Sequence, residues 1–247
     1  MGRATSLLGG RRLAAFAALG VVIWSYYIWR VSLPNLPFWW DVALLVFPII
    51  PGVLALPLLL MPLWRTNGWA LLGAAALLAL TALLCQQADY RIAANFAKLF
   101  APALVGWWFL RYFESLSWVV LVACLVPIVD AYSVWRGPTH QIVTKKEHIF
   151  TAFSFAFPVP HQGTARLGLP DLLFFALFLA AADRFQLRVW QTFALTALSF
   201  GATVVLADAF ALQGLPALPL LSVGFLGANC DLLWRRRRGA NSAARQE

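Results

Sequence analysis

The chain has 247 residues, of which 62% are hydrophobic and only 12% are charged, and its formal net charge is +9. A soluble domain is ordinarily about half apolar, so this composition and its long apolar blocks exclude an ordinary soluble protein and indicate an integral membrane protein. The basic residues stand between the apolar blocks and at both ends of the chain, which argues against nucleic-acid binding.

Eight apolar stretches approach the length of about 20 residues that a helix needs to cross a bilayer. They predict spans at residues 12–30, 40–63, 68–86, 97–113, 115–136, 167–183, 188–209 and 214–234. The first stretch is too long for a signal-peptide core and ends in aromatic residues, so we interpret it as a retained helix. The fourth is short, and the preceding "QQADYRIAANF" is interpreted as a separate interfacial helix.

Residues 137–166 form the one long connection, and long loops often carry function. Its apolar end, "IFTAFSFAFPVP", has the aromatic and β-branched content of a strand, although packing on lipid or on the loop is an equal alternative. His140, His148 and His161 share this loop at irregular spacing with no clustered acidic or cysteine partner. We interpret them as solvated loop residues and expect no metal and no cofactor.

The distribution of Lys and Arg predicts the orientation of the spans. With eight spans both termini lie on one side, which collects twelve basic residues, while the other side has seven. The larger group is Arg3, Arg11, Arg12, Arg65, Arg111, Arg184, Arg188, Arg235, Arg236, Arg237, Arg238 and Arg245. We therefore expect a multi-pass protein of a prokaryotic plasma membrane, with both termini cytoplasmic and the long loop outside.

Most of the ten acidic residues have a simple structural interpretation. Asp41, Asp89, Asp183 and Asp231 fall at span ends or loops, where water or a neighbouring arginine satisfies them, and Asp231 is expected to pair with the adjacent Arg235–Arg238 run. Two others are not explained in this way. Asp130 lies about two thirds of the way along the fifth span, and Asp171 lies in the first turns of the sixth. Ionisable residues inside a membrane are candidates for function.

Asp130 and Asp171 are expected at the same membrane face, because consecutive spans run antiparallel. Asp130 precedes the end of its span by about 9 Å of helix rise, and Asp171 follows the start of its span by a comparable distance. Two close carboxylates in a medium of low dielectric share a proton. Such a pair supplies a general base for water and a general acid for a leaving amine. The alternative is that each aspartate pairs with a cation or caps a helix.

Three segments resemble the presenilin and signal peptide peptidase family of intramembrane aspartyl proteases. They are "VDAYSVWRGPTH" (129–140), "LGLPDLLFFALFL" (167–179) and "QGLPALPLL" (213–221). The family has a Tyr-Asp in one helix, a Gly-x-Gly-Asp opening the next and a Pro-Ala-Leu starting the last. These signatures map onto Asp130, onto Gly168, Leu169 and Asp171, and onto Pro216, Ala217 and Leu218. The "DAYSVW" continuation resembles the microbial presenilin-like members.

The resemblance implies an all-α polytopic membrane protein of about eight, or nine, helices. Residues 1–114 would be a transmembrane scaffold of about four helices, residues 115–234 the catalytic half, and residues 235–247 a basic cytoplasmic tail. It also implies an aspartic endopeptidase with Asp130 and Asp171 as the dyad. Substrate binding would fall to Gly168, Leu169, Pro170, Pro216, Ala217 and Leu218. The partners would be transmembrane segments and the lipid bilayer, and the orientation matches the signal-peptide-peptidase branch, whose substrates have cytoplasmic N-termini.

Two positions depart from the family pattern. Val129 stands where the family has Tyr, and Pro170 replaces the second glycine before the aspartate. We expect Pro170 at the first position of its helix, with Asp171 in the first turn, and Pro216 at the top of the last helix, where it removes a backbone donor or is an ordinary first-turn proline.

Three other functions remain open on these residues. The chain could be a non-cleaving family member that binds transmembrane helices. It could also be a proton-coupled transporter or channel that uses the aspartates as relays. Prepilin peptidases pair intramembrane aspartates as well, but they lack the Pro-Ala-Leu helix.

Overall fold

In the computed structural model of the chain, the described residues are 8–34, 37–135, 152–159, 163–209 and 216–243. They form the helices α2 (Gly10–Trp29), α3 (Phe38–Leu44), α4 (Ile50–Leu60), α5 (Gly68–Gln87), α6 (Arg91–Phe109), α7 (Leu116–Trp135), α10 (Leu169–Arg184), α11 (Val189–Ala209) and α12 (Leu218–Ala243). A π-helical turn at Leu45–Ile49 joins α3 to α4, and 3-10 turns at Arg30–Ser32, Met61–Arg65 and Leu110–Tyr112 end three helical stretches. Strands β1 (Ser154–Val159) and β2 (Gly163–Gly168) pair antiparallel.

Six helical stretches among the described residues are long and apolar enough to cross a membrane. They are Gly10–Trp29, Phe38–Arg65, Gly68–Gln87, Arg91–Tyr112, Leu116–Ser133 and Val189–Ala207. The prediction of an all-α polytopic membrane protein is therefore confirmed, with one β-hairpin added to the helices. α10 and α12 coincide with the two remaining predicted spans, but α10 has only 16 residues and α12 carries the arginine run.

The fourth span differs from its prediction. α6 begins at Arg91 and continues unbroken to Phe109, so the last six residues of "QQADYRIAANF" belong to the span and not to a separate interfacial helix. The helix starts after its cap residue Tyr90, and Asp89 before it adopts a left-handed backbone conformation with φ 60° in the turn from α5. The first turns of α6 already bury Ala94 and Asn95 against the rest of the chain. Tertiary packing therefore extends the helix through residues too polar to indicate a span on their own.

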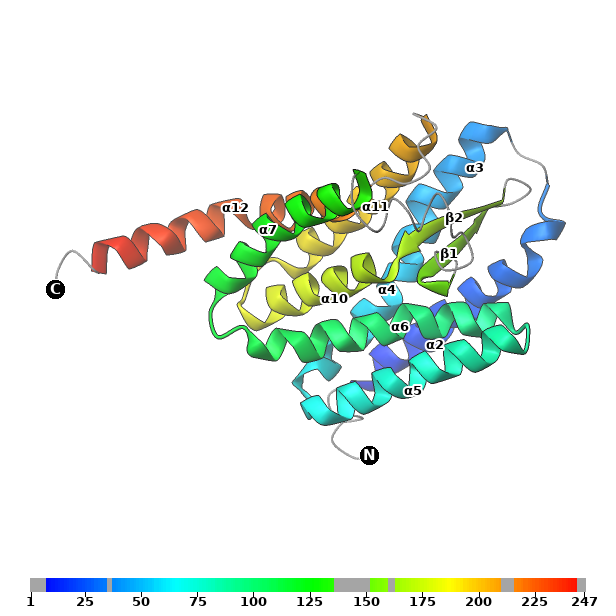
Figure 1. Cartoon of the computed structure of the whole chain (residues 1–247), viewed down its shortest axis with the longest axis horizontal. Coiled ribbons are helices and arrows are strands. Elements are labelled where there is room, and N and C mark those ends of the chain that lie inside the picture. The colour runs from blue at the N-terminus through cyan, green and yellow to red at the C-terminus, as the bar shows by residue number, and fades with distance from the viewer. Residues whose placement is uncertain (1–7, 35–36, 136–151, 160–162, 210–215, 244–247) are drawn as a thin grey trace.

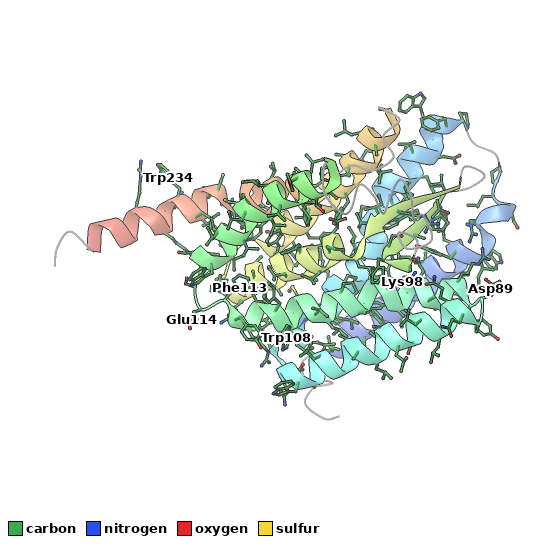
Figure 2. All side chains as sticks on the ribbon, viewed as in Figure 1. Asp89, Lys98, Trp108, Phe113, Glu114 and Trp234 are labelled. Carbon is green, nitrogen blue, oxygen red and sulfur yellow. The ribbon has the colours of Figure 1, made fainter. Side chains whose placement is uncertain are left out.

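The helices lie roughly along the long axis of the molecule and alternate in direction (Figure 1). The hairpin and the α5–α6 turn mark one end, called here the hairpin end, where Figure 2 labels Asp89. Phe113, between α6 and α7, and Glu114 mark the opposite end (Figure 2). α10 continues directly from β2 and runs through the middle of the bundle, with α6 on one side and α7 and α12 on the other (Figure 1).

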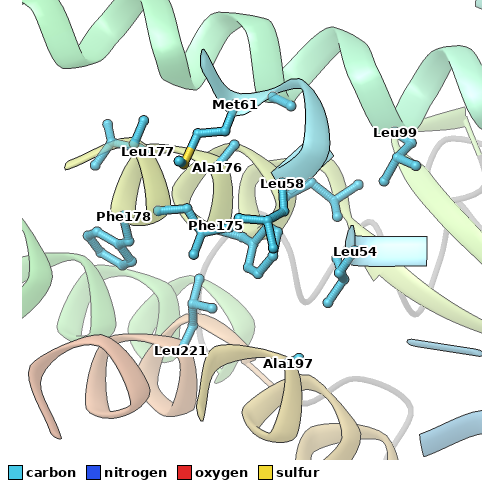
Figure 3. Packing of buried hydrophobic residues seen from close by; sticks show 14 of the residues in the cluster. Leu54, Leu58, Met61, Leu99, Phe175, Ala176, Leu177, Phe178, Ala197 and Leu221 are labelled. Carbon is cyan, nitrogen blue, oxygen red and sulfur yellow. The ribbon is translucent and has the colours of Figure 1, made fainter. Parts of the chain in front are cut away.

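α10 forms the centre of the hydrophobic core. Nearly every residue from Leu172 to Ala182 is buried, whereas the other helices are apolar but leave large side chains on the outside of the bundle. Figure 3 shows residues of α4, α6, α11 and α12 around Phe175 and Phe178, and the ring of Phe178 stacks on Phe225 at 4.6 Å. A helix that is apolar on all sides is buried in the core or spans a membrane. Here neighbouring helices supply the apolar surroundings that lipid supplies to an isolated span.

One glycine sets the distance between α6 and α10. A Cβ atom on Gly106 would lie 2.5 Å from the backbone oxygen of Leu173 and 3.3 Å from the backbone nitrogen of Leu177. Both atoms belong to the α10 backbone, which cannot rotate away as a side chain could. Small residues of this kind allow membrane helices to approach closely.

Charged groups at the opposite end are paired, with one difference from expectation. Asp183 accepts hydrogen bonds from the side chains of Trp64 at 2.9 Å and Arg65 at 2.8 Å. Asp231 binds both terminal nitrogens of Arg188, at 2.9 and 2.7 Å. The expected pairing of Asp231 with Arg235–Arg238 was therefore wrong, because those arginines follow on the same helix while Arg188 reaches across from the start of α11.

Asp41 also departs from its simple interpretation. It was expected to meet water at a span end, but it is 1% exposed within α3. Its charge acts on Tyr26 of α2. Asp41 is itself part of the short helix α3, whose packing buries it, and the hydropathy pattern alone does not indicate this.

Candidate active site

Asp171 is held at the junction of β2 and α10. Gly168 caps α10, Leu169 and Pro170 are its first two residues, and Asp171 is the third. The backbone N–H of Gly168 donates a hydrogen bond of 3.1 Å to Oδ2 of Asp171. A carboxylate at this position reaching back to the cap residue is one half of a capping box.

Pro170 is the second helical residue and not the first, as had been expected. The second position suits proline as well as the first does. N–H groups in the first turn have no helical acceptor, and no preceding helical turn is present for the proline ring to clash with. The glycine of the family pattern is therefore not needed for the helix to begin here. The chain reaches Asp171 through an ordinary helix start.

Gly168 is the position at which a side chain would disturb the carboxylate. A Cβ atom there would lie 3.0 Å from Oδ2 of Asp171 and 3.5 Å from the ring of Pro170. Any larger residue would therefore push against the oxygen that the Gly168 N–H binds. The glycine keeps both the hydrogen bond and the space around it.

Asp130 projects from α7 toward the start of α12. The backbone N–H of Leu218 donates a hydrogen bond of 3.2 Å to Oδ2 of Asp130. Leu218 is the first residue of α12, so Asp130 acts as an anion at a helix N-terminus, where free N–H groups and the helix dipole favour negative charge. The Pro-Ala-Leu segment therefore contacts the aspartate through the main chain of its leucine.

Pro216 lies two residues before α12 and not within its first turn, so neither version of the earlier expectation holds for this proline. Pro216 and Ala217 are buried, and the backbone oxygen of Ala217 accepts the first helical bond from Leu221. Pro219 is the second residue of α12 and has no N–H to offer. Leu218 is thus the donor that this start presents to Asp130.

Asp130 and Asp171 lie near enough for the charge of one to act on the other. Both carboxylates are half-buried, and the charge of Asp130 acts directly on Asp171. Asp171 is hydrogen-bonded to the backbone N–H of Gly168 in its own motif, and Asp130 to the backbone N–H of Leu218 in the Pro-Ala-Leu motif. The three segments that are separate in the sequence therefore meet at one place in the fold.

α10 is shorter than a full membrane span. Its 16 residues span about 24 Å, less than the ~30 Å thickness of a bilayer core. Arg184 ends the helix and binds the backbone oxygen of Leu110 at 2.6 Å, which anchors that terminus at the opposite end. The first turn of α10 follows directly from β2 of the hairpin at the other terminus of the helix.

An apolar cavity lies next to the segment of α7 that carries Asp130, which is not itself among the described lining residues. It has a volume of about 680 Å³ and lies between α7, α11 and the start of α12. Its walls include Ala131 beside the aspartate, and Pro216 and Pro219 on either side of the Leu218 donor. Pro127, three residues before Asp130, interrupts the hydrogen bonding of α7 at the same level. The cavity therefore borders a part of α7 that is less rigidly held than a regular helix.

The hairpin carries the strand that the sequence suggested. β1 occupies residues 154–159 of the apolar segment, and its partner β2 leads into α10. Phe155 and Phe157 point into the core, where their rings meet at 4.7 Å. The strand pattern in "IFTAFSFAFPVP" is confirmed for its described part.

The outer edge of β1 is already occupied. The side chain of Asn95 donates to the backbone oxygen of Ala156 and accepts from its N–H, both at 2.8 Å. The hydroxyl groups of Tyr27 and Tyr26 donate to the backbone oxygens of Ala156 and Pro158, both at 2.7 Å. These three side chains from α2 and α6 take the place of a neighbouring strand.

This arrangement leaves β2 as the open edge. Because the backbone of Ala156 points toward Asn95, its partner Arg166 is in a non-hydrogen-bonded pair and turns its own N–H and C=O away from β1. The backbone N–H and C=O of Thr164 also point away from β1, because every second residue of a strand directs these groups to the same edge. Within the described residues no group hydrogen-bonds to the backbone of Thr164 or Arg166 on this edge, which ends at Gly168, whose N–H donates to Asp171.

The sequence interpretation did not include Asn95 or the tyrosines of α2. A pattern that indicates them is the spacing of Asn95 and Lys98, two polar residues three positions apart on one face of an apolar helix. The three histidines of the long loop lie outside the described residues. Among the residues that are described, no group of three or more His, Cys, Asp or Glu side chains could hold a metal ion.

Comparisons with protein-family models, with curated proteins and with solved structures find no match for this chain. The function must therefore be argued from the residues and their geometry.

Proposed function

We propose that the chain is an intramembrane aspartyl protease that resembles the presenilin and signal peptide peptidase family. The observation that carries the proposal is the hydrogen bond between the Leu218 N–H and Asp130, at a site where Asp130 also interacts with Asp171. The Pro-Ala-Leu segment thereby holds Asp130, and Gly168 of its own segment holds Asp171. Carboxylates fixed in this way suit a catalytic pair, whose geometry must be maintained through the reaction.

In the proposed reaction one aspartate is ionised and the other is protonated. The ionised group accepts a proton from a water molecule, whose oxygen attacks the carbonyl carbon of the peptide bond. The protonated group first donates to the carbonyl oxygen. In the collapse of the tetrahedral intermediate the C–N bond breaks and the amine leaves with a proton, so that one water is consumed and an acid and an amine are produced. Asp130 and Asp171 need no metal and no cofactor for these steps.

The substrate is proposed to be the transmembrane segment of another protein. Its helix hides the peptide bonds, so it must unwind before water can attack. The apolar cavity beside Asp130 is suited to an apolar segment that arrives from the lipid, and the open edge of β2 is suited to pair with the unwound chain. An added strand on β2 would pass next to Gly168 and so come close to Asp171.

The finer features of the prediction belong to the same proposal. Eight spans would put both termini in the cytoplasm and the hairpin end outside, in accordance with the count of basic residues. The membrane is proposed to be a prokaryotic plasma membrane. Substrates would then present their N-termini to the cytoplasm.

The test is cleavage of a fluorogenic transmembrane peptide by the purified chain in detergent. Wild-type protein is expected to cut the peptide and to be blocked by a transition-state analogue of aspartyl proteases. Asp130→Asn and Asp171→Asn should each lower the rate by about 10²–10⁴-fold, the usual contribution of general acid–base catalysis.

Asp89→Asn is the matched control. It makes the same chemical change at the hairpin end, at an exposed residue with φ 60° that asparagine tolerates well. Its rate should equal that of the wild type. A wild-type protein that binds the peptide but does not cut it between pH 4 and 8 would instead be a helix-binding protein, and aspartate-dependent proton flux in liposomes would indicate a transporter.

A further inference from the structure

A second cavity lies at the hairpin end, apart from the apolar cavity between α7, α11 and α12. It has a volume of about 420 Å³, within the ~300–1,000 Å³ common for ligand sites. It lies between α2, the α5–α6 turn and the hairpin, and it is called here the hairpin pocket. Its lining includes Thr164 and Arg166, the two residues whose backbone forms the open edge of β2.

Arg166 differs from the other two arginines of the lining in its surroundings. Arg30 donates to the backbone oxygen of Tyr27 at 2.8 Å, and Arg91 forms an ion pair of 2.7 Å with Asp89, the one carboxylate among the described lining residues. Arg166 is half-buried, and no described carboxylate forms an ion pair with it. A partly buried guanidinium is costly to leave without an acceptor. A negatively charged group is therefore the complement of this position.

The side chain of Arg166 and its open backbone edge face the same incoming strand. A strand that pairs with β2 places the side chain opposite Arg166 on the same face of the sheet, with about 5 Å between the Cβ atoms. That face lines the hairpin pocket, since residues 154, 156, 158, 164 and 166 alternate onto it while Phe155 and Phe157 point to the core. The side chain opposite Arg166 consequently enters the hairpin pocket.

The direction of β2 determines where this side chain lies in the substrate. β2 runs from the hairpin end toward the start of α10, which carries Asp171 (Figure 1). A substrate with a cytoplasmic N-terminus, as proposed above, runs the other way and pairs antiparallel with β2. Its residue opposite Arg166 then follows its residue opposite Gly168 by two positions. Because the Gly168 N–H binds Asp171, the residue opposite Arg166 lies on the C-terminal side of the scissile bond.

We propose that Arg166 is a specificity-determining residue that selects transmembrane substrates with a glutamate or aspartate on the C-terminal side of the scissile bond. The inference rests on the proposed protease function and on strand pairing with β2, and it names the substrate class of that site. The substrate carboxylate accepts charge-assisted hydrogen bonds from the guanidinium. This contact forms when the unwound chain binds and does not change as the peptide bond breaks. It should therefore lower KM and leave kcat unaltered.

The test compares fluorogenic transmembrane peptides that carry either glutamate or glutamine at one position, and this position is moved along the residues after the cleavage site. The purified full-length chain in uncharged detergent should cleave the glutamate peptide with a KM about three- to tenfold lower at one position, the range of a charge pair between strands. The two neighbouring positions should show no preference, because their side chains point to the other face of the sheet.

Substitutions of Arg166 test its role directly. Arg166→Gln should abolish the preference for glutamate, and Arg166→Lys should retain part of it because the charge is kept. Arg166→Glu should reverse the preference, so that a peptide with lysine at this position is favoured over one with glutamate. Each preference is a ratio of two peptides measured on one preparation, so a lower folded fraction in a variant does not change it.

Arg91→Gln is the matched control, because it removes a cation from the lining of the same pocket, on α6 and not on β2. The Arg91 side chain is 84% accessible and already paired with Asp89, so the preference should stay within about twofold of the wild type. An equal loss of preference in Arg91→Gln and Arg166→Gln would overturn the proposal. Equal KM values for glutamate and glutamine at every position in the wild type would overturn it as well.

Failure of the proposed protease function gives a different result. Binding of the intact peptides is measured with Asp130→Asn, by competition with a fluorescent peptide. Tighter binding of the glutamate peptide with the same dependence on Arg166, but without cleavage by the wild type, would overturn the protease and retain recognition by Arg166. Cleavage of both peptides with equal KM would overturn the recognition and retain the protease.

Discussion

The contact between α6 and α10 gives the sharpest test of the fold. The perturbation is Gly106→Ala, which adds one methyl group at the closest approach of the two helices. The new carbon would lie 2.5 Å from the oxygen of Leu173, whereas ordinary contact begins at about 3.4 Å. The two helices must therefore separate by about 0.9 Å, because both clashing partners are backbone atoms.

The expected cost follows from this displacement. Overpacking of a well-packed interior typically costs about 1–3 kcal/mol. For a chain of about this length that corresponds to a fall of about 2–12 °C in the melting temperature. The cleavage rate should also fall strongly, because Asp171 precedes Leu173 by two residues on the displaced helix and would move with it. A misplacement of about 1 Å at a catalytic group can lower the rate by about 10²-fold.

The control is Gly73→Ala on α5, where an added Cβ atom meets nothing within 4 Å. It makes the same change in composition and backbone freedom, so the difference between the two variants measures the clash alone. Melting temperature is followed by scanning fluorimetry in detergent, and activity by cleavage of the transmembrane peptide. Equal melting temperatures for both variants would refute the close contact between α6 and α10, and the argument about Asp171 with it.

Three further predictions concern the site and its supports. Gly168→Ala should lower the cleavage rate about tenfold with little change in melting temperature, because its Cβ atom would press on Oδ2 of Asp171 at 3.0 Å; a rate equal to wild type would contradict this. Asn95→Ala should destabilise the chain by about 1–3 kcal/mol and speed amide hydrogen exchange in β1, since it removes both hydrogen bonds to that strand, whereas the exposed Gln87→Ala should do neither. Arg188→Gln should cost no more than about 1 kcal/mol, because its ion pair at the opposite end is partly exposed, with the arginine side chain 43% accessible; a loss that is larger and insensitive to salt would show that the pair is more buried than described.

The sequence alone determined where the helices lie. Hydrophobic length is a local property, so the apolar blocks predicted the positions of α2, α5, α7 and α11 to within a few residues. The aromatic and β-branched content of residues 154–159 likewise indicated β1. Asp130 and Asp171 stood out because each is a carboxylate within an apolar stretch and not at its cytoplasmic or loop end.

The sequence did not determine which polar groups pair. β2, "GTARLG", contains two glycines and an arginine and has little strand character, so it forms only because β1 is beside it. Asp231 pairs with Arg188 of the preceding loop and not with the arginines that follow it on α12. In each case the choice depends on which segments the packing brings together.

The candidate site shows the same division. Local signals predicted the aspartates and the helix start at Pro170. That Asp130 receives its hydrogen bond from Leu218, 88 residues away, depends on α7 packing beside α12, and the hydrogen bonds between Asn95 and Ala156 depend on the hairpin lying against α6. The residue type and its neighbours in the sequence determine whether a polar side chain lies within an apolar stretch. Only the tertiary structure decides which distant backbone donor or charge it meets, because that contact is created when the helices pack.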